Sequence, residues 1–217
     1  MRATPSSSDL APFLDFALLR PDASAQDIER LCKEAQTRRL HGVCVHGSRV
    51  AQARMLLEET ELKIVCAVGF PFGTAAGDVK RFEVEAAIDD GAHEIDLVLH
   101  VGMLKDGNDH LLLRELRDAV EAADERPVTI MLQTGLLSGE EMVRACQLCD
   151  DAGVQGIGAL ANFSDNGAGT ETVKLLREAV DPKFEVKISG DIRDAKIVLA
   201  MMDAGATRAV VSGLPQL

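Results

Sequence analysis

Two charged residues stand inside apolar runs, where charge is costly unless it is paired or used. Asp96 lies in the run Glu94–His100, and Lys187 lies in the run Val-Lys-Ile-Ser that ends at Ser189. If both runs are strands of one barrel, side-chain alternation points Asp96, Val98 and His100 inward, and it points Lys187 and Ser189 inward as well. A desolvated lysine is an amine nucleophile or a base, and a carboxylate beside it relays protons. The pattern predicts chemistry next to a carbonyl group; a purely structural ion pair is the alternative.

Further polar residues stand near the ends of the predicted strands. The predicted catalytic residues are Lys187, Asp96, Asp15 and His100, and the predicted substrate-binding residues are His46, Gln133, Asn162, Ser189, Asp191 and Ser212. Each of them alone is typical of an ordinary strand end. We expect them to act together because the carboxyl ends of parallel strands meet at one mouth of a barrel.

The elements that position these residues alternate along the chain. β-rich runs are predicted at 13–18, 43–46, 64–70, 95–101, 128–134, 156–161, 186–189 and 209–212, and helices at 24–39, 79–90, 111–123, 139–152, 170–180 and 195–204. Ser24, Ser138 and Thr170 are candidate N-caps. Gly91, Gly153 and Gly205 each separate a helix from the next strand, as left-handed C-caps do.

Repeated helix–Gly–strand units predict a parallel sheet closed into a single (β/α)₈ barrel domain over residues 1–217. The chain stops five residues after Ser212, so we expect a trimmed C-terminal end without a full eighth helix.

Composition excludes several kinds of partner. A net charge of −12 disfavours nucleic acid and anionic membranes, and no apolar run is long enough to cross a bilayer. Neither a dinucleotide fingerprint nor a P-loop is present, so no cofactor is expected. Five cysteines, an odd number, predict reduced thiols and a cytoplasmic location. The expected partner is a small carbonyl substrate, with a homodimer as a further possibility.

Several motifs carry a resemblance to a known family. They are Leu18–Asp22 (family LLKPD), Val43–Val45 (VCV), Gly69–Gly73 (GFPxG), Glu94–Asp96 (EID), Leu136-Leu137 (ETCLL), Val186–Gly190 (VKASGG) and Ala204–Arg208 (AGATR). From about Leu14 to Gly213 the chain resembles the deoxyribose-phosphate aldolases, class I aldolases with a (β/α)₈ barrel. The resemblance implies that Lys187 is the family's second, proton-relaying lysine, Asp96 its acid–base aspartate and Asp15 its first-strand aspartate.

The chain departs from the family at the mouth of the barrel. Gly158 stands at the Schiff-base lysine of the family motif VKTSTGF, so the family's covalent mechanism cannot run there. His46 and His100 replace asparagines, and Gln133 replaces the glutamate of ETCLL. In the phosphate cup, two glycine positions are occupied by Asn162 and Asp191, and the second of these is an anion where phosphate would lie. These departures predict a non-phosphorylated substrate.

Three functions remain open from the sequence. The first is a repurposed, biosynthetic lyase in which Lys187 and Asp96 act on a carbonyl compound, with or without an imine on Lys187. Its reaction is cleavage or formation of a carbon–carbon bond, cyclisation or dehydration. The second is a metal-assisted enzyme that binds a divalent ion through His46, His100 and either Asp191 or Asp15. The third is a catalytically silent binding or regulatory protein.

Overall fold

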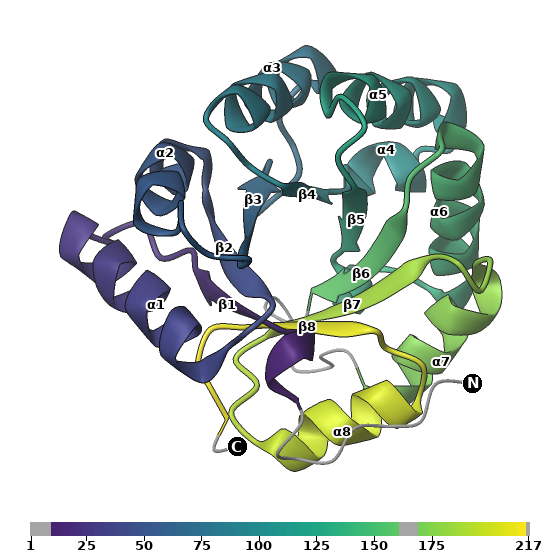
Figure 1. Cartoon of the computed structure of the whole chain (residues 1–217). Helices are drawn as coiled ribbons and strands as arrows, with labels where there is room; N and C mark the ends of the chain where they lie inside the picture. The colour runs from purple at the N-terminus through teal and green to yellow at the C-terminus, as the bar shows by residue number, and fades with distance from the viewer. Residues whose placement is uncertain (1–9, 161–168, 216–217) are drawn as a thin grey trace.

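Eight parallel strands close into a barrel that is surrounded by helices (Figure 1). The structure is a computed structural model, and it describes residues 10–160 and 169–215. The strands are β1 (Leu14–Leu18), β2 (Gly42–His46), β3 (Lys63–Val68), β4 (Glu94–Val98), β5 (Val128–Leu132), β6 (Gly156–Leu160), β7 (Glu185–Gly190) and β8 (Arg208–Val211). Each strand pairs with the next in the chain, and β8 pairs with β1, so the (β/α)₈ barrel predicted from the sequence is confirmed.

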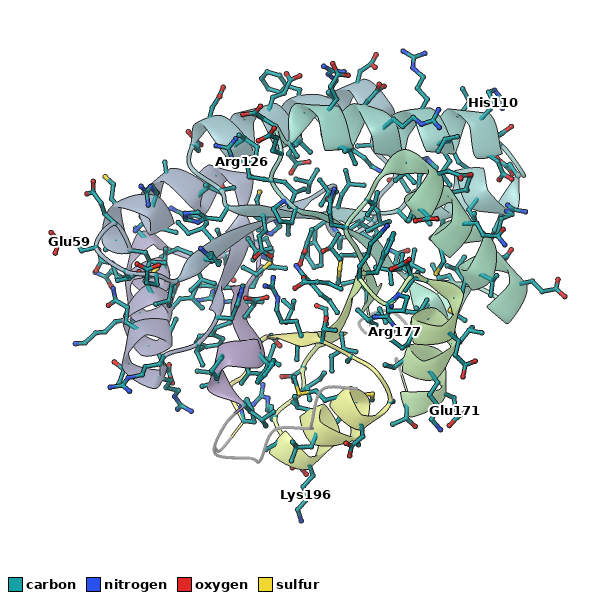
Figure 2. The ribbon with its side chains drawn as sticks, turned by 45° about the vertical axis from the view of Figure 1, so that its right-hand side comes forward. Glu59, His110, Arg126, Glu171, Arg177 and Lys196 are labelled. Carbon is teal, nitrogen blue, oxygen red and sulfur yellow. The ribbon has the colours of Figure 1, made fainter. Side chains whose placement is uncertain are left out.

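The helices form the outer ring. They are α1 (Ala25–Arg38), α2 (Gly47–Leu56), α3 (Gly77–Asp89), α4 (Val101–Lys105), α5 (Asp109–Ala122), α6 (Gly139–Ala152), α7 (Thr170–Ala179) and α8 (Ala195–Asp203). Charged helix residues such as Glu171 and Lys196 point away from the barrel into solvent (Figure 2). No helix in residues 10–160 and 169–215 is long and apolar enough to span a membrane.

Side-chain alternation divides the apolar residues into separate cores. Ile95, Leu97 and Leu99 belong to the large core between the strands and the helices, as their spacing predicts. Val98 faces the barrel interior, where it packs with Met131 and Leu160. A second interior cluster contains Ala17, Cys44, Val65, Ala67 and Val210. The interior is therefore filled by side chains and is not a pore.

The predicted helix starts are partly confirmed. Ser24 and Ser138 each accept a hydrogen bond from the third helical residue in a reciprocal capping box. Thr170 is not a cap: it is the first helical residue of α7, and Gly169 precedes it as N-cap. Gly153 is the C-cap of α6 in a left-handed conformation, as predicted.

At the carboxyl end of the barrel, β3 and β4 end earlier than predicted. β4 ends at Val98, and His100 instead begins the short helix α4 by accepting a hydrogen bond from the Met103 N–H. After β5, residues Thr134–Leu136 form a single 3₁₀ turn. Beyond β8 the described chain, which ends at residue 215, forms no helix.

Candidate active site

Lys187 and Asp96 meet inside the barrel. The ammonium Nζ of Lys187 donates to Asp96 Oδ1 at 2.8 Å and to Glu94 Oε2 at 3.2 Å. Lys187 has no solvent exposure and Asp96 is 3% exposed. The two strands face each other across the barrel, because β4 and β7 are separated by β5 and β6 on one side. The inward placement predicted from alternation is therefore confirmed for both residues.

A chain of charges continues from this pair toward the amino ends of the strands. The Arg208 guanidinium contacts the Glu94 carboxylate and lies 3.2 Å from Asp15 Oδ2. Asp15 also lies 2.9 Å from His41 Nδ1, and Arg208 lies 2.7 Å from His41 Nε2. Asp15 is thus a partner of Arg208 and His41, and its predicted catalytic role remains a prediction.

The network fixes the charge states of its members. Burial disfavours the ammonium form of Lys187, but the carboxylates of Asp96 and Glu94 outweigh burial, and the pKa of Lys187 is raised. Burial raises the pKa of Asp96 despite the neighbouring Lys187. Burial also acts to raise the pKa of Glu94, yet Lys187 and Arg208 lower it to about 2. These shifts favour the ammonium form of Lys187 and the carboxylate form of Glu94, whereas burial favours the protonated form of Asp96.

A pocket of about 190 Å³ opens at the carboxyl ends of the strands. Its walls come from the ends of β1, β3, β7 and β8: Ala17, Leu19, Arg20, Phe70, Ser189, Gly190, Val210 and Ser212. Ser189 follows Lys187 by two residues on the same face of β7, so the pocket lies above the Lys187–Asp96 pair. Ser189 and Ser212 supply hydroxyl donors that suit an anionic oxygen ligand, and Arg20, whose guanidinium is paired with Asp22 and Asp27, adds a cation.

An apolar cluster inside the barrel reaches the pocket wall. It is the interior cluster of Val98, Met131 and Leu160, with Phe70 packed against it. Gly158 pairs with Lys187 in the register of β6 and β7. A Cβ atom added at Gly158 would lie 2.3 Å from Met131 Sδ and 2.7 Å from its Cε. The thioether of Met131 therefore occupies the space that a side chain at position 158 would need.

Asp191 does not lie in the pocket wall, which corrects the expectation that it excludes phosphate. Its carboxylate accepts hydrogen bonds from Arg193 Nε at 2.8 Å and from the Ser212 hydroxyl at 3.3 Å. The hydrogen bond from Arg193 lowers the pKa of Asp191. Its charge is matched by a neighbouring cation, so the argument from an unpaired anion fails.

The two histidines take positions that a metal site would not use. His46 Nε2 donates to the Leu19 carbonyl at 3.0 Å, and its ring packs against Phe70 with centroids 5.7 Å apart. His100 Nδ1 is occupied as the cap of α4. In the part of the chain that the structure describes, no three His, Cys, Asp or Glu side chains are grouped to hold a metal ion. The expected metal set of His46, His100 and Asp191 or Asp15 is not assembled.

Gln133 and Asn162 complete the predicted positions. Gln133 is buried, and its amide donates to the Pro71 carbonyl at 2.7 Å, so it fixes the loop that follows β3. Asn162 lies outside the described residues. Of the predicted binding residues that the structure describes, Ser189 and Ser212 line the pocket, whereas His46, Gln133 and Asp191 do not.

Sequence reasoning missed four residues of this site: Glu94, Arg208, His41 and Arg20. Side-chain alternation could have identified two of them. Glu94 lies two residues before Asp96, and Arg208 lies two residues before Val210, so each shares the inward face of its strand. His41 lies just before β2, and Arg20 lies in the loop after β1, where no periodicity applies.

Comparisons with known proteins agree with this geometry. A model of the DeoC/LacD family aldolases matches residues 15–155. A deoxyribose-phosphate aldolase of Alkaliphilus oremlandii is 42% identical over 92% of this chain and 90% of its own length. One from a Geobacillus species is 42% identical over 93% and 91%.

Solved structures give the same result. A structure titled "QR15, an Aldolase" superimposes with a TM-score of 0.89 at 29% identity, and covers 94% of this chain and 91% of its own. A tetrameric deoxyribose phosphate aldolase from Aeropyrum pernix superimposes with a TM-score of 0.87 at 26% identity, over 95% and 88%. The family model matches residues 15–155, and relatives about 42% identical cover more than nine-tenths of the chain. This chain therefore belongs to the DeoC/LacD family of aldolases.

Proposed function

We propose that the chain is a carbon–carbon lyase that cleaves a phosphorylated deoxy-sugar, with deoxyribose phosphate as the first compound to test. The observation that carries the proposal is the Lys187–Asp96 pair beneath a pocket lined by Arg20, Ser189 and Ser212. The names of the relatives support the same substrate class.

The expectation of a non-phosphorylated substrate is wrong. It rested on Asp191, which is paired with Arg193 and lies outside the pocket wall. Relatives about 40% identical over more than nine-tenths of the chain are named for a phosphorylated sugar. The prediction of a repurposed lyase is wrong for the same reason.

Aldol cleavage needs one proton removed and one supplied. A base takes the proton from the hydroxyl group β to the carbonyl, the bond between the α and β carbons breaks, and its electrons form an enolate. The buried Lys187 ammonium group stabilises the negative charge on the enolate oxygen, because the attraction between opposite charges is stronger in a site that excludes water. Asp96 moves the proton, because it lies 2.8 Å from the Lys187 ammonium group and burial raises its pKa, which favours uptake of a proton.

An imine on Lys187 is the finer alternative within the same proposal. It requires the neutral amine, and the surrounding carboxylates hold the ammonium form. Borohydride reduction during turnover separates the two routes: a mass adduct on Lys187 supports the imine, whereas turnover without an adduct supports the acid–base route.

Turnover of deoxyribose phosphate tests the function. We expect release of a two-carbon aldehyde and a phosphorylated three-carbon aldehyde. Lys187→Met and Asp96→Asn should each reduce kcat at least 100-fold. Lys196→Met, which removes an outward-pointing lysine on α8, serves as the control and should leave activity intact (Figure 2). Absence of cleavage by the unaltered chain would contradict the proposal.

Assembly and location belong to the same proposal. A homodimer that forms through the helix ring is supported by Val79 and Phe82, which are exposed apolar side chains on α3. Light scattering after gel filtration measures it. A reducing, cytoplasmic location is supported by five cysteines that are all free and buried.

A further inference from the structure

Beside the pocket wall lies a carboxylate that already accepts hydrogen bonds from the donors that a bound anion would need. Asp191 directly follows β7, and its Oδ1 accepts from both Arg193 Nε at 2.8 Å and the Ser212 hydroxyl at 3.3 Å. Ser212 is part of the pocket wall. The Arg193 guanidinium lies close over the neighbouring Gly213, where a Cβ atom would be 3.1 Å from Nε.

Carboxylate and phosphate oxygens compete for the same donors. Both accept charge-assisted hydrogen bonds from guanidinium and hydroxyl groups, and two such anions on one set of donors repel each other. The hydrogen bond from Arg193 lowers the pKa of Asp191, so this carboxylate is charged throughout the neutral pH range.

The Asp191–Arg193 pair is easy to open. The side chains are 59% and 74% exposed, and ion pairs in solvent contribute little to stability. A ligand that offers a stronger anion can therefore turn Asp191 outward without disturbing β7 or β8. The carboxylate lowers affinity at the rim but does not close the pocket.

We propose that Asp191 is an internal competitor for the phosphate group of the substrate. In the free protein it holds the Ser212 hydroxyl and Arg193; on binding, phosphate displaces it and takes both donors. The inference rests on the proposed function only in taking a phosphorylated ligand at this pocket. It assigns Asp191 as the residue that sets how tightly that ligand is held.

Binding of inorganic phosphate tests the competition without requiring turnover. We expect Asp191→Asn to lower the Kd for phosphate about fivefold at low ionic strength, as expected for one removed charge at contact distance in water. The gain should shrink in 0.5 M salt, because added ions screen exposed charges. Calorimetry on the full chain measures the affinity.

A second pair of the same design provides the control. Asp124 accepts from Arg126 at 2.7 Å with the same two-residue spacing, but it lies between α5 and β5, at the amino end of the barrel. Asp124→Asn changes the net charge equally and should leave the Kd for phosphate unchanged. Equal tightening by both variants would show a general charge effect, and no tightening by Asp191→Asn would show no competition; either result overturns the inference.

Turnover separates this inference from the proposed function. If the unaltered chain cleaves deoxyribose phosphate but Asp191→Asn binds phosphate no more tightly, the competitor role fails and the function stands. If Asp191→Asn tightens phosphate while no variant cleaves the sugar, the competitor role stands and the function fails. Asp191→Ala, which also removes the hydrogen-bonding amide, repeats the test should the asparagine variant fold poorly.

Discussion

Lys187 is held by two carboxylates and shielded from water, a combination that makes it more a fixed cation than a free amine. Asp96 lies at 2.8 Å and Glu94 at 3.2 Å from its Nζ. In the proposed reaction these neighbours have separate tasks: Lys187 supplies positive charge and Asp96 transfers the proton.

Removal of Lys187 should unbalance the interior. Lys187→Met leaves Asp96 and Glu94 buried, with Arg208 as the remaining cation beside Glu94, so we expect a loss of about 3–5 kcal/mol in the free energy of unfolding at pH 7. The loss should be smaller at pH 5, because Asp96 then takes a proton more readily. Urea unfolding at the two pH values measures it. Lys187→Met combined with Asp96→Leu should recover stability; failure to recover would show that the pair is not the cause.

Gly158 and Met131 should behave as a coupled pair. In Gly158→Ala the new methyl meets Met131 Sδ at 2.3 Å, so Met131 must leave its place, at a cost of about 1–3 kcal/mol. We expect a smaller cost when Met131 is already alanine, and a double-mutant cycle from denaturation curves gives the coupling. Gly47→Ala is the control, because its methyl meets only Cys66 Sγ at 3.9 Å. Additive effects of the two substitutions would contradict the contact.

At the scale of elements, one buried ion pair ties two helices to the barrel. Lys80 of α3 has no solvent exposure, donates to Glu115 of α5 at 2.7 Å, and donates to the Val98 carbonyl at the end of β4 at 3.0 Å. The pair therefore fixes α3 and α5 beside the strand that carries Asp96.

Lys80→Met should destabilise the ring of helices. It leaves the Glu115 carboxylate buried without its cation, and we expect a loss of about 3–5 kcal/mol. Lys80→Met with Glu115→Leu should restore most of it, because an apolar pair of similar volume is tolerated there. Thermal unfolding of the two variants compares them. If the double variant is no more stable than the single one, the unpaired carboxylate is not the cost.

Element prediction from sequence succeeded where periodicity is long. Ser24 and Ser138 mark helices with a clear apolar face, and the eight strands alternate with them. The helices α2 and α4 were not predicted. α2 begins at Gly47 with weak amphipathic character, and α4 has only five residues, begun by the His100 side chain. Local chemistry of this kind leaves no repeating pattern in the sequence.

At the scale of the whole molecule, charge inside the barrel makes stability depend on pH. The pKa of Glu94 is lowered to about 2 from an ordinary value of 4.5, through Lys187 and Arg208 acting against burial. A lowered folded-state pKa stabilises the protein above the unfolded value, and the contribution is lost as pH falls from about 4.5 toward 2.

Glu94→Gln should flatten the acid limb of the stability curve. We expect the unaltered chain to lose on the order of 3 kcal/mol through Glu94 between pH 5 and 2, and the variant to lose correspondingly less. Urea midpoints across this pH range measure the difference. Glu171→Gln, at a residue that points into solvent from α7, is the control (Figure 2). Parallel curves for Glu94→Gln and the unaltered chain would contradict the assignment.

The whole barrel also explains which site residues escaped prediction. Alternation within one strand places Asp96 and Lys187 inward, but only closure of β8 against β1 brings Arg208 beside Asp15 and Glu94. The side chain of Asp191 points toward Arg193, two residues further along the chain, with which it forms an ion pair. Stagger and side-chain rotamers decide such contacts, and neither is written in a strand's own sequence.

The position of Phe70 suits a fluorescent probe of the pocket. Phe70 lines the pocket and packs against the interior cluster of Val98, Met131 and Leu160, and the chain has neither tryptophan nor tyrosine. Phe70→Trp would therefore carry the sole indole of the molecule at the mouth of the barrel. Its fluorescence should change when a ligand enters or when Met131 moves, with no background emission from elsewhere in the chain.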